Sequence, residues 1–591
     1  ECQAVHLADC QVEFWPAMVL GEVLLRGRER VEGAAEEAGA LEALRLQRNF
    51  LCGRERDVEA EVPQGLRSLG AGLSGPGFHP TLLDLSDNII GPQGLSALAQ
   101  GLMFSASLQE LRLADNPLCG LNPNGYGTFN ISGVEELSRA LCPPGLPSPA
   151  LSTGLGASPS SAAGGADVLS TGLDQRSGKP ASSVAGVPHP EPLGYGSRPG
   201  TPSRLSGASG YGSNPSITGR RAAGVHQGLQ AASLHQTLRV LDLADCQICD
   251  EGVRDIAKVL QPHEMAGSYN TTLQQLNLSG NRIGPRGMAT LAAALSEAPC
   301  GVVNTSLTAL NMERNEITKR GADLGGLSAM AAALRGAETA EAGGAGKARR
   351  LKAGGEPSRA GSVASSGARP CGLASLNLMA NCLGVTGSQL IVDVFLSSFT
   401  LRTLSGLHPE EKSLDLSGEH IRFDDLMLLS ADISVNTTIT ALDVSSTGID
   451  APGLRALAAS LGTAPPAARS GSSGAYDCVA AEGRPTAVAG QALRSLVLSN
   501  NVLAGRGSRE EAVQLEGMKA LGEALSCNDR LTLLDLCGNQ LDGEALGYLT
   551  AGLHDNAALS HLYLSSGDRF GRDGLHTTIW GRRPNNQSLL A

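Results

Sequence analysis

Acidic and amide residues recur at one position of a repeated pattern, between two apolar residues that are mostly leucine. The set consists of Asp84, Asp242, Asn277, Asn311, Asn377, Asp415, Asp443 and Asp535. Because alternate residues of a strand point to opposite faces, we expect these side chains to share the face opposite to the flanking leucines. Five carboxylates and three amides on one face could bind a basic or polar segment of a protein partner. The alternative is that Leu-Asp-Leu-Ser is simply the usual strand sequence of this repeat, since the aromatic and Arg anchors typical of interfaces are few.

The charge at this position changes sign along the chain. The early copies of the pattern carry basic residues there, namely His6, Arg45 and Arg112. The acidic run lies near the C-terminal half and consists of Asp415, Asp443 and Asp535. Complementary charge mainly sets the rate and orientation of association. The sequence therefore predicts that a partner on this face docks on the acidic run, with a defined polarity.

The sequence offers little for catalysis or metal binding. Cys246 and Cys249 form one Cys-x-x-Cys pair, but a zinc site needs a second pair of ligands. Lys179 follows a glycine as in a phosphate loop, yet Pro180 stands where Ser or Thr must reach the metal. No Gly-x-Ser-x-Gly elbow surrounds a serine. We therefore predict no enzymatic activity, no cofactor, no metal and no small-molecule substrate.

These residues belong to a repeat of the form Leu-x-x-Leu-x-Leu-x-x-Asn/Cys-x-Leu/Ile. Thirteen copies begin at Cys2, Leu41, Pro80, Leu108, Leu238, Leu273, Leu307, Leu373, Glu411, Ile439, Leu493, Leu531 and Leu559. The shortest interval between starts is 28 residues, and we interpret the longer intervals as this unit plus an insertion. Repeats of this length indicate a solenoid, because each unit buries its apolar face only against its neighbours.

A second motif follows each copy: Gly, an apolar residue, two others, Leu/Ile/Met, three others and Leu. Examples begin at Gly94, Gly252, Gly287, Gly453 and Gly517. This spacing predicts an amphipathic helix, whereas the preceding Leu-x-Leu predicts a short strand. Strands lie about 4.8 Å apart and packed helices about 8–10 Å apart, so the stack must curve with its sheet inside. We therefore expect an α/β solenoid shaped as a horseshoe, with a parallel sheet on the concave face and helices on the convex face.

Asparagines occupy two further places in the repeat. The Asn or Cys at the ninth position, which includes Cys246, is expected to satisfy backbone groups of the turn. Asn270, Asn304 and Asn436 stand a few residues before a strand. We interpret these three as helix-end residues, where Asn tolerates left-handed geometry.

The units resemble the ribonuclease-inhibitor-like class of leucine-rich repeats. The likeness is closest in the stretch Asn270–Leu295, NTTLQQLNLSGNRIGPRGMATLAAAL. The same pattern occurs in the repeat regions of NACHT-linked receptors, in Ran GTPase-activating proteins and in cytoskeletal or ciliary scaffolds. The resemblance implies the fold, but function is not carried by the fold.

Segments rich in Pro, Gly, Ser and Ala interrupt the repeats. We expect repeat blocks at 1–141, 233–335, 372–461 and 492–591, separated by disordered inserts at 142–232, 336–371 and 462–491. The first two inserts are basic, whereas the chain of 591 residues has a net charge of −12. An acidic repeat body argues against nucleic acid as a partner. No apolar run approaches the 18–20 residues of a membrane span.

The function that we predict is a non-enzymatic protein-interaction scaffold, which binds its partner on the concave sheet face or through its inserts. One alternative is the repeat region of a NACHT-type sensor whose switch domain precedes residue 1, because the chain begins with Glu. The other is a GTPase-activating protein of the Ran type, with an Asn and an Arg on repeat loops contributing to hydrolysis. Thirteen cysteines at scattered spacings, without a secretory signal, favour a reducing cytoplasmic compartment. Association with the cytoskeleton or a cilium is a further expectation.

Overall fold

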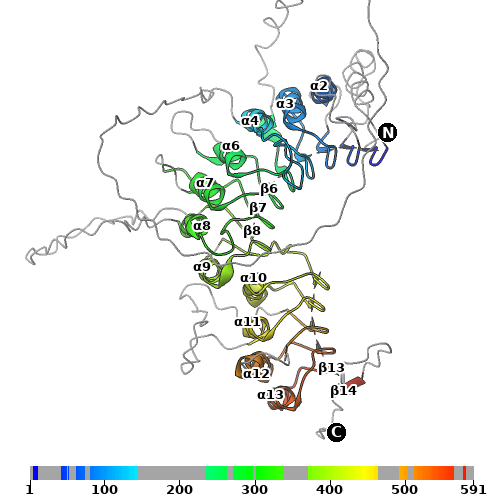
Figure 1. Cartoon of the computed structure of the whole chain (residues 1–591), viewed down its shortest axis with the longest axis vertical. Coiled ribbons are helices and arrows are strands. Elements are labelled where there is room, and N and C mark those ends of the chain that lie inside the picture. The colour runs from blue at the N-terminus through cyan, green and yellow to red at the C-terminus, as the bar shows by residue number, and fades with distance from the viewer. Residues whose placement is uncertain are drawn as a thin grey trace, which may run out of the picture. The chain divides into compact units, whose positions relative to one another are not determined.

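A computed structural model gives the arrangement of the repeats (Figure 1). It describes residues 4–10, 42–49, 51, 62–73, 80–142, 234–262, 270–296, 298, 301–336, 371–398, 400–462, 492–503, 511–554, 556–564 and 577–580. The chain divides into two units, of which the larger comprises 1–146 and 231–591 and contains all the elements described below. Nearly all of the three predicted inserts lies outside the described residues, so the expected disorder and boundaries remain predictions.

Thirteen parallel strands follow the thirteen starts of the leucine pattern, each beginning two residues after its start. They are β1 (Ala4–His6), β2 (Ala43–Arg45), β3 (Leu82–Asp84), β4 (Glu110–Arg112), β5 (Val240–Asp242), β6 (Gln275–Asn277), β7 (Ala309–Asn311), β8 (Ser375–Asn377), β9 (Ser413–Asp415), β10 (Ala441–Asp443), β11 (Ser495–Val497), β12 (Leu533–Asp535) and β13 (His561–Leu564). The strands form two sheets in chain order, β1 to β8 and β9 to β13. A final strand, β14 (Thr577–Trp580), pairs antiparallel with β13 and was not predicted.

The helices lie on one face of the strands, as Figure 1 shows for α6 to α8 beside β6 to β8. They are α2 (Val62–Leu73), α3 (Pro92–Leu102), α4 (Ser132–Leu141), α5 (Leu234–Thr237), α6 (Asp250–Leu260), α7 (Pro285–Leu295), α8 (Gly325–Arg335), α9 (Gly384–Ser397), α10 (Phe423–Val435), α11 (Ala451–Leu461), α12 (Glu511–Cys527) and α13 (Gly543–Leu553). The strand-turn-helix unit and the parallel sheet of the predicted α/β solenoid are confirmed.

The repeat leucines fill the space between strands and helices. Leu276 and Leu278 keep 2% and 0% of their surface exposed. In several repeats the glycine of the helix motif has a packing role, because it lies against the start of the preceding helix. A Cβ atom on Gly517 would come within 2.5 Å of the carbonyl oxygen of Ala451. The Gly in this motif therefore lets adjacent helices approach closely.

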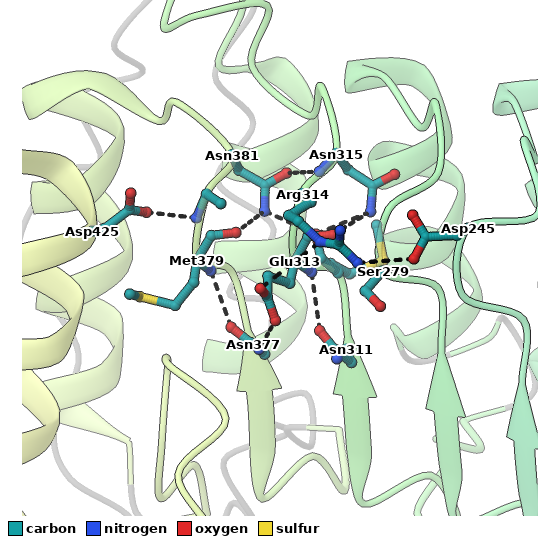
Figure 2. Close-up of polar contacts among 12 residues, drawn as sticks. Asp245, Ser279, Asn311, Glu313, Arg314, Asn315, Asn377, Met379, Asn381 and Asp425 are labelled. Atoms are coloured by element: carbon teal, nitrogen blue, oxygen red, sulfur yellow. Dashed lines mark hydrogen bonds and ion pairs between the residues drawn. The ribbon is translucent and has the colours of Figure 1, made fainter. Parts of the chain in front are cut away.

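The asparagines at the ninth position form a hydrogen-bonded ladder through the turns, part of which Figure 2 shows. Asn315 donates its amide hydrogens to the carbonyl oxygen of Leu278 in the preceding repeat (2.9 Å) and to that of Met312 in its own (3.0 Å). Its Oδ1 accepts from the backbone N–H of Ile283, and its own backbone N–H donates to Oδ1 of Asn381. The predicted role of this position is confirmed, since each side chain satisfies buried backbone groups of two repeats.

A second set of asparagines precedes the strands, and here the expected left-handed geometry is wrong. Asn436 has φ −75° and ψ 135°, which is extended backbone. Asn270 and Asn304 are fully buried and do not adopt positive φ. Asn304 donates to the carbonyl oxygen of Leu260, the last residue of a neighbouring helix (2.8 Å), and its Oδ1 accepts two backbone N–H groups ahead of its strand. Asn270 and Asn304 therefore join the helix ends of adjacent repeats instead of reversing the chain.

The two sheets meet at a junction formed by residues 400–435. The interval from Leu373 to Glu411 was expected to hold one repeat with an insertion, but it contains an extra, incomplete repeat. Thr403 pairs in parallel with Ser375 of β8, while β9 is the edge strand of the second sheet. The segment lacks the third leucine of the pattern, where Gly406 stands with φ +75°. We attribute the interruption of the sheet to that missing leucine.

Carboxylates of α10 replace the asparagine ladder at this junction. Asp425 accepts from the backbone N–H of Ala380 (2.6 Å), as Figure 2 shows. Asp432 accepts from Thr403 Oγ1 (2.7 Å) and the backbone N–H of Leu404 (2.8 Å), and also from the N–H and hydroxyl of Ser405. Burial raises the pKa of Asp432, and burial together with the neighbouring Asp424 raises the pKa of Asp425 to about 6.

Candidate functional site

The eight Asp and Asn residues of the sequence prediction all end a strand and all make the same hydrogen bond. In each, Oδ1 accepts from the backbone N–H two residues ahead, at 2.9 to 3.2 Å. Asn311, for example, accepts from Glu313 (3.0 Å) and Asn377 from Met379 (3.0 Å), as Figure 2 shows. Asp and Asn side chains make this local bond readily. The residue type at this position therefore has a structural cause as well as any functional one.

The exposure of the eight residues is uneven, which the sequence did not predict. Asp84 and Asn377 are buried at 6% and 9% exposure, so these two side chains are less open to a partner than the others. Asp415 on the edge strand β9 is exposed, and the remaining five are half-buried. The register partners of Asp84 on β2 and β4 are the long side chains Arg45 and Arg112.

A hollow of about 320 Å³ on the first sheet gathers half of the predicted residues. Its walls contain the ends of β4 to β8 and include Arg112, Asp242, Asn277, Asn311 and Asn377. Asp84 does not line it. The other three predicted residues belong to the second sheet. The structure therefore separates the candidate site into a polar hollow on the first sheet and an acidic run on the second.

The carboxylates of these two regions differ in their electrostatics. Burial raises the pKa of Asp242, although the backbone N–H of Ala244 and the nearby Arg112 favour its charged form. The pKa of Asp415 is instead lowered, because the hydroxyl and backbone N–H of Ser417 both donate to it. Asp242 therefore carries the less stabilised charge.

The basic residues at the same position are already engaged. Arg112 pairs with Glu110, its neighbour on β4, and its Nε donates to Glu110 Oε1 at 2.6 Å. A guanidinium nitrogen of Arg45 lies 3.0 Å from Nε2 of His6 on the adjacent strand. Arg112 therefore offers only part of its charge to Asp242.

Sequence reasoning missed a second charged row, at the eighth position of the repeat. Asp87, Asp115 and Asp245 stand there with φ of 53° to 56°, in the left-handed region where Asp is tolerated. Burial, together with Asp245 and Asp87, raises the pKa of Asp115. Arg314, at the same position two repeats beyond Asp245, reaches back to it (2.8 Å), as Figure 2 shows. A comparison of the eighth residues of successive repeats in the sequence would have revealed this row.

Cys246 acts as a ladder residue. Its Sγ lies 3.2 Å from the carbonyl oxygens of Leu113 and Ala244, in the place that an asparagine amide takes elsewhere. Its thiol is buried and its pKa is raised far above the usual value. Within the described ranges no three His, Cys, Asp or Glu side chains are grouped so that they could hold a metal ion. Nor does any helix of the described part have the length and apolar character to cross a membrane.

Comparison with known proteins supports the assignment of the repeat. The model of the Leucine Rich repeat family matches residues 81–99, 235–257, 269–292, 303–324 and 435–458. A Ran GTPase-activating protein of Drosophila melanogaster is 41% identical over 98 residues, which are 16% of this chain and 14% of that protein. The chain thus matches only about a seventh of the length of this relative.

Two solved structures are similar at low identity. One, titled leiomodin-1 actin-binding site 2, has 16% identity and a TM-score of 0.20, over 31% of this chain and 80% of that one. The other, an internalin of Listeria monocytogenes, has 12% identity and a TM-score of 0.28, over 86% and 78%. Neither likeness bears on function. The pattern of leucines, the thirteen parallel strands with their helices and the family match together show that this chain is a leucine-rich repeat protein of the ribonuclease-inhibitor-like type.

Proposed function

We propose that this chain is a non-enzymatic scaffold that binds a protein partner through the ends of its strands. The observation that carries the proposal is the shared hydrogen bond of the eight Asp and Asn residues. Because Oδ1 is bound to the backbone, each aspartate retains one carboxylate oxygen for a ligand. Such a row complements a partner segment that carries Lys or Arg.

The acidic run of the second sheet supports a defined docking polarity. Asp415, Asp443 and Asp535 stand on β9, β10 and β12, whereas Arg45 and His6 stand at the other end of the first sheet. Exposed ion pairs are worth about 0.2–1 kcal/mol each and are screened by salt. The proposed association is therefore sensitive to ionic strength.

The test replaces all three aspartates of the acidic run by Asn. Asn keeps the oxygen that accepts the backbone N–H, so the substitution removes charge while it preserves the turn. We expect a partner captured by cross-linking to the wild-type chain to bind the triple variant about 3- to 160-fold more weakly at low salt, at about 0.2–1 kcal/mol for each of three pairs, and the difference to shrink at high salt.

The matched control is the triple change Glu135→Gln, Glu251→Gln and Glu523→Gln, which removes the same charge from exposed helix positions. Binding that survives the aspartate changes but is lost in the control would contradict docking on the sheet face.

A second candidate function is activation of a GTPase, and the match to a Ran GTPase-activating protein favours it. In this chain two of the turn arginines already have partners. Arg314 holds Asp245, and Arg282 donates to the carbonyl oxygen of Pro123 (3.2 Å). An arginine that acted on a bound GTPase would have to leave these contacts. Single-turnover GTP hydrolysis by Ran, with and without the chain, separates this function from a scaffold.

The remaining expectations concern context. A nucleotide-binding motif upstream in the gene would favour the repeat region of a NACHT-type sensor. A cytoplasmic location, attached to the cytoskeleton or to a cilium, fits a scaffold of this kind. Fluorescence imaging of the tagged chain tests the location directly.

A further inference from the structure

The polar hollow on the first sheet presents donors and acceptors in separate places. In Asn277, Asn311 and Asn377 the oxygen is bound to the backbone, so the group left over is the NH₂ donor. In Asp242 the same bond leaves a carboxylate oxygen, which is an acceptor. The backbone bonds fix this assignment, because an N–H cannot donate to an NH₂ group. The hollow therefore has an acceptor at β5 and donors from β6 to β8.

Two of these donors are already used inside the hollow and one is not. Asn277 donates its side chain to Asp242, and Asn377 donates to Glu313 Oε2 at 3.0 Å. Within the described residues the NH₂ group of Asn311 has no hydrogen-bond partner. Asn311 lies on β7, between the strands that carry the other two asparagines. A half-buried donor without a partner is a place where a ligand acceptor gains most.

Asp242 is the corresponding acceptor without a dedicated cation. Arg112 lies near it, but that guanidinium pairs with Glu110. Burial disfavours the charge of Asp242, and a cation brought by a ligand would offset that cost. A ligand could therefore supply a cation for Asp242 on β5 and a hydrogen-bond acceptor for Asn311 on β7.

We propose that the hollow binds an extended peptide segment of a partner protein, with a Lys or Arg side chain at Asp242 and a main-chain carbonyl oxygen at Asn311. This rests on the proposed scaffold function and names the chemistry that one of its two regions recognises. Adjacent strands are about 4.8 Å apart and an extended chain advances about 3.3 Å per residue. The distance from β5 to β7 thus takes about three residues, and the whole hollow from β4 to β8 about six.

The experiment selects ligands from a phage-displayed library of random twelve-residue peptides on the purified full chain. We expect the selected peptides to be enriched in Lys and Arg. Asp242→Asn keeps an oxygen for the N–H of Ala244 but removes the charge and one of the two oxygens that serve Ala244 and Asn277, and should weaken these peptides more than tenfold. Asn311→Ser keeps a short acceptor for the N–H of Glu313 but removes the NH₂ group, and should weaken them about fivefold. Dissociation constants are measured by fluorescence anisotropy.

The matched control is Asn124→Ser, on an exposed loop outside the hollow, which should leave the dissociation constants unchanged. Thermal unfolding of each variant shows that it is folded. A library that yields no binders, binders without Lys or Arg, or binders that tolerate both hollow variants would overturn the proposal. Because the acidic run on the second sheet is tested separately with a captured partner, failure of one experiment leaves the result of the other standing.

Discussion

The turns of the first sheet and the junction at residues 400–435 satisfy buried backbone groups with different side chains. In the turns, neutral asparagines such as Asn315 both donate and accept, so most repeats of the first sheet are bound to the next by similar bonds, with Cys246 as an exception. At the junction the groups to be satisfied are N–H and O–H donors, and Asp425 and Asp432 supply acceptors only. A ladder residue must hydrogen-bond to backbone donors and acceptors at the same time, which an amide can do. At the junction only donors have to be satisfied, and a carboxylate can do this.

The bonds that join one repeat to the next therefore depend on pH where carboxylates replace the asparagines. An amide does not titrate, so a ladder of asparagines stabilises the turns equally at any pH near neutrality. A buried carboxylate has a pKa that differs between the folded and unfolded states, so its contribution varies with pH. We therefore expect the ladder to be the insensitive part and the junction to be the responsive part.

The largest effect that we expect comes from a cavity in the regular region. Leu278→Ala removes a fully buried side chain next to the ladder and should cost about 2–5 kcal/mol. Because each repeat contacts only its neighbours, amide hydrogen exchange should accelerate first around β5 to β7. Leu498→Ala, the equivalent change in the second sheet, is the control and should loosen β10 to β12 instead. Equal acceleration throughout both sheets in either variant would contradict local coupling.

The next effect distinguishes the carboxylate at the centre of the junction. Asp432→Asn places an NH₂ group where Thr403 and Ser405 both donate, so at least one buried donor loses its acceptor. We expect a loss of about 3 kcal/mol, measured by urea unfolding at pH 7. Faster hydrogen exchange should be confined to α10 and the segment that pairs with β8. A neutral result would mean that Asp432 is already protonated and donating in the native protein.

A smaller loss is expected from the ladder itself. Asn281→Ala leaves the backbone N–H groups of Cys246 and Ile248 and the carbonyl oxygen of Leu243 without their side-chain partner. Water reaches a turn more readily than the core, so the cost should be about 1–3 kcal/mol. The loss should be the same at pH 5 and pH 7, because no group involved titrates between them. A clear pH dependence would overturn the contrast drawn between ladder and junction.

The effect of opposite sign should come from Asp425. Its folded pKa of about 6 lies above the unfolded value of 3.8, so the folded state holds the extra proton between these values. This contribution to stability is present at low pH and is lost as pH rises from about 4 to 6. Asp425→Asn keeps an acceptor for Ala380 without the charge, and should raise stability by about 1–2 kcal/mol at pH 7 but change little at pH 4.5. Thermal unfolding at both pH values measures it; a variant that is less stable at pH 7 would contradict the prediction.

The sequence predicted the regular parts of this fold well, because the leucine spacing reports a geometry that every repeat shares. All thirteen strands begin two residues after their predicted starts, even at degenerate copies such as Glu411. The ninth position could be assigned a role because the same residue type recurs at the same place in the turn. Local periodicity is sufficient where each unit repeats the contacts of the last.

The junction and the hollow could not be predicted in this way. Nothing in the spacing indicated that Gly406, in place of a leucine, would end one sheet, or that Asp432 would turn toward Thr403. The eight Asp and Asn residues all end strands, but their division between two sheets depends on that interruption. The shared bond to the residue two ahead was also missed, although Asp and Asn are the residue types that make it.

The asparagines that precede the strands have a consequence for how this chain can lengthen. Asn270 donates to the carbonyl oxygen of Leu141, a residue 129 positions earlier, and Asn528 donates to that of Leu461, 67 positions earlier. Each bond joins a repeat that follows an insert to the end of the helix that precedes the insert. Across the longer insert, β4 and β5 remain paired in register. A segment of any length can thus enter after a helix at little cost to the neighbouring repeats, since loop closure entropy grows only slowly with length. These positions are accordingly the natural places for fusing a reporter or a foreign domain, and the rest of the stack should accept such a graft without rearrangement.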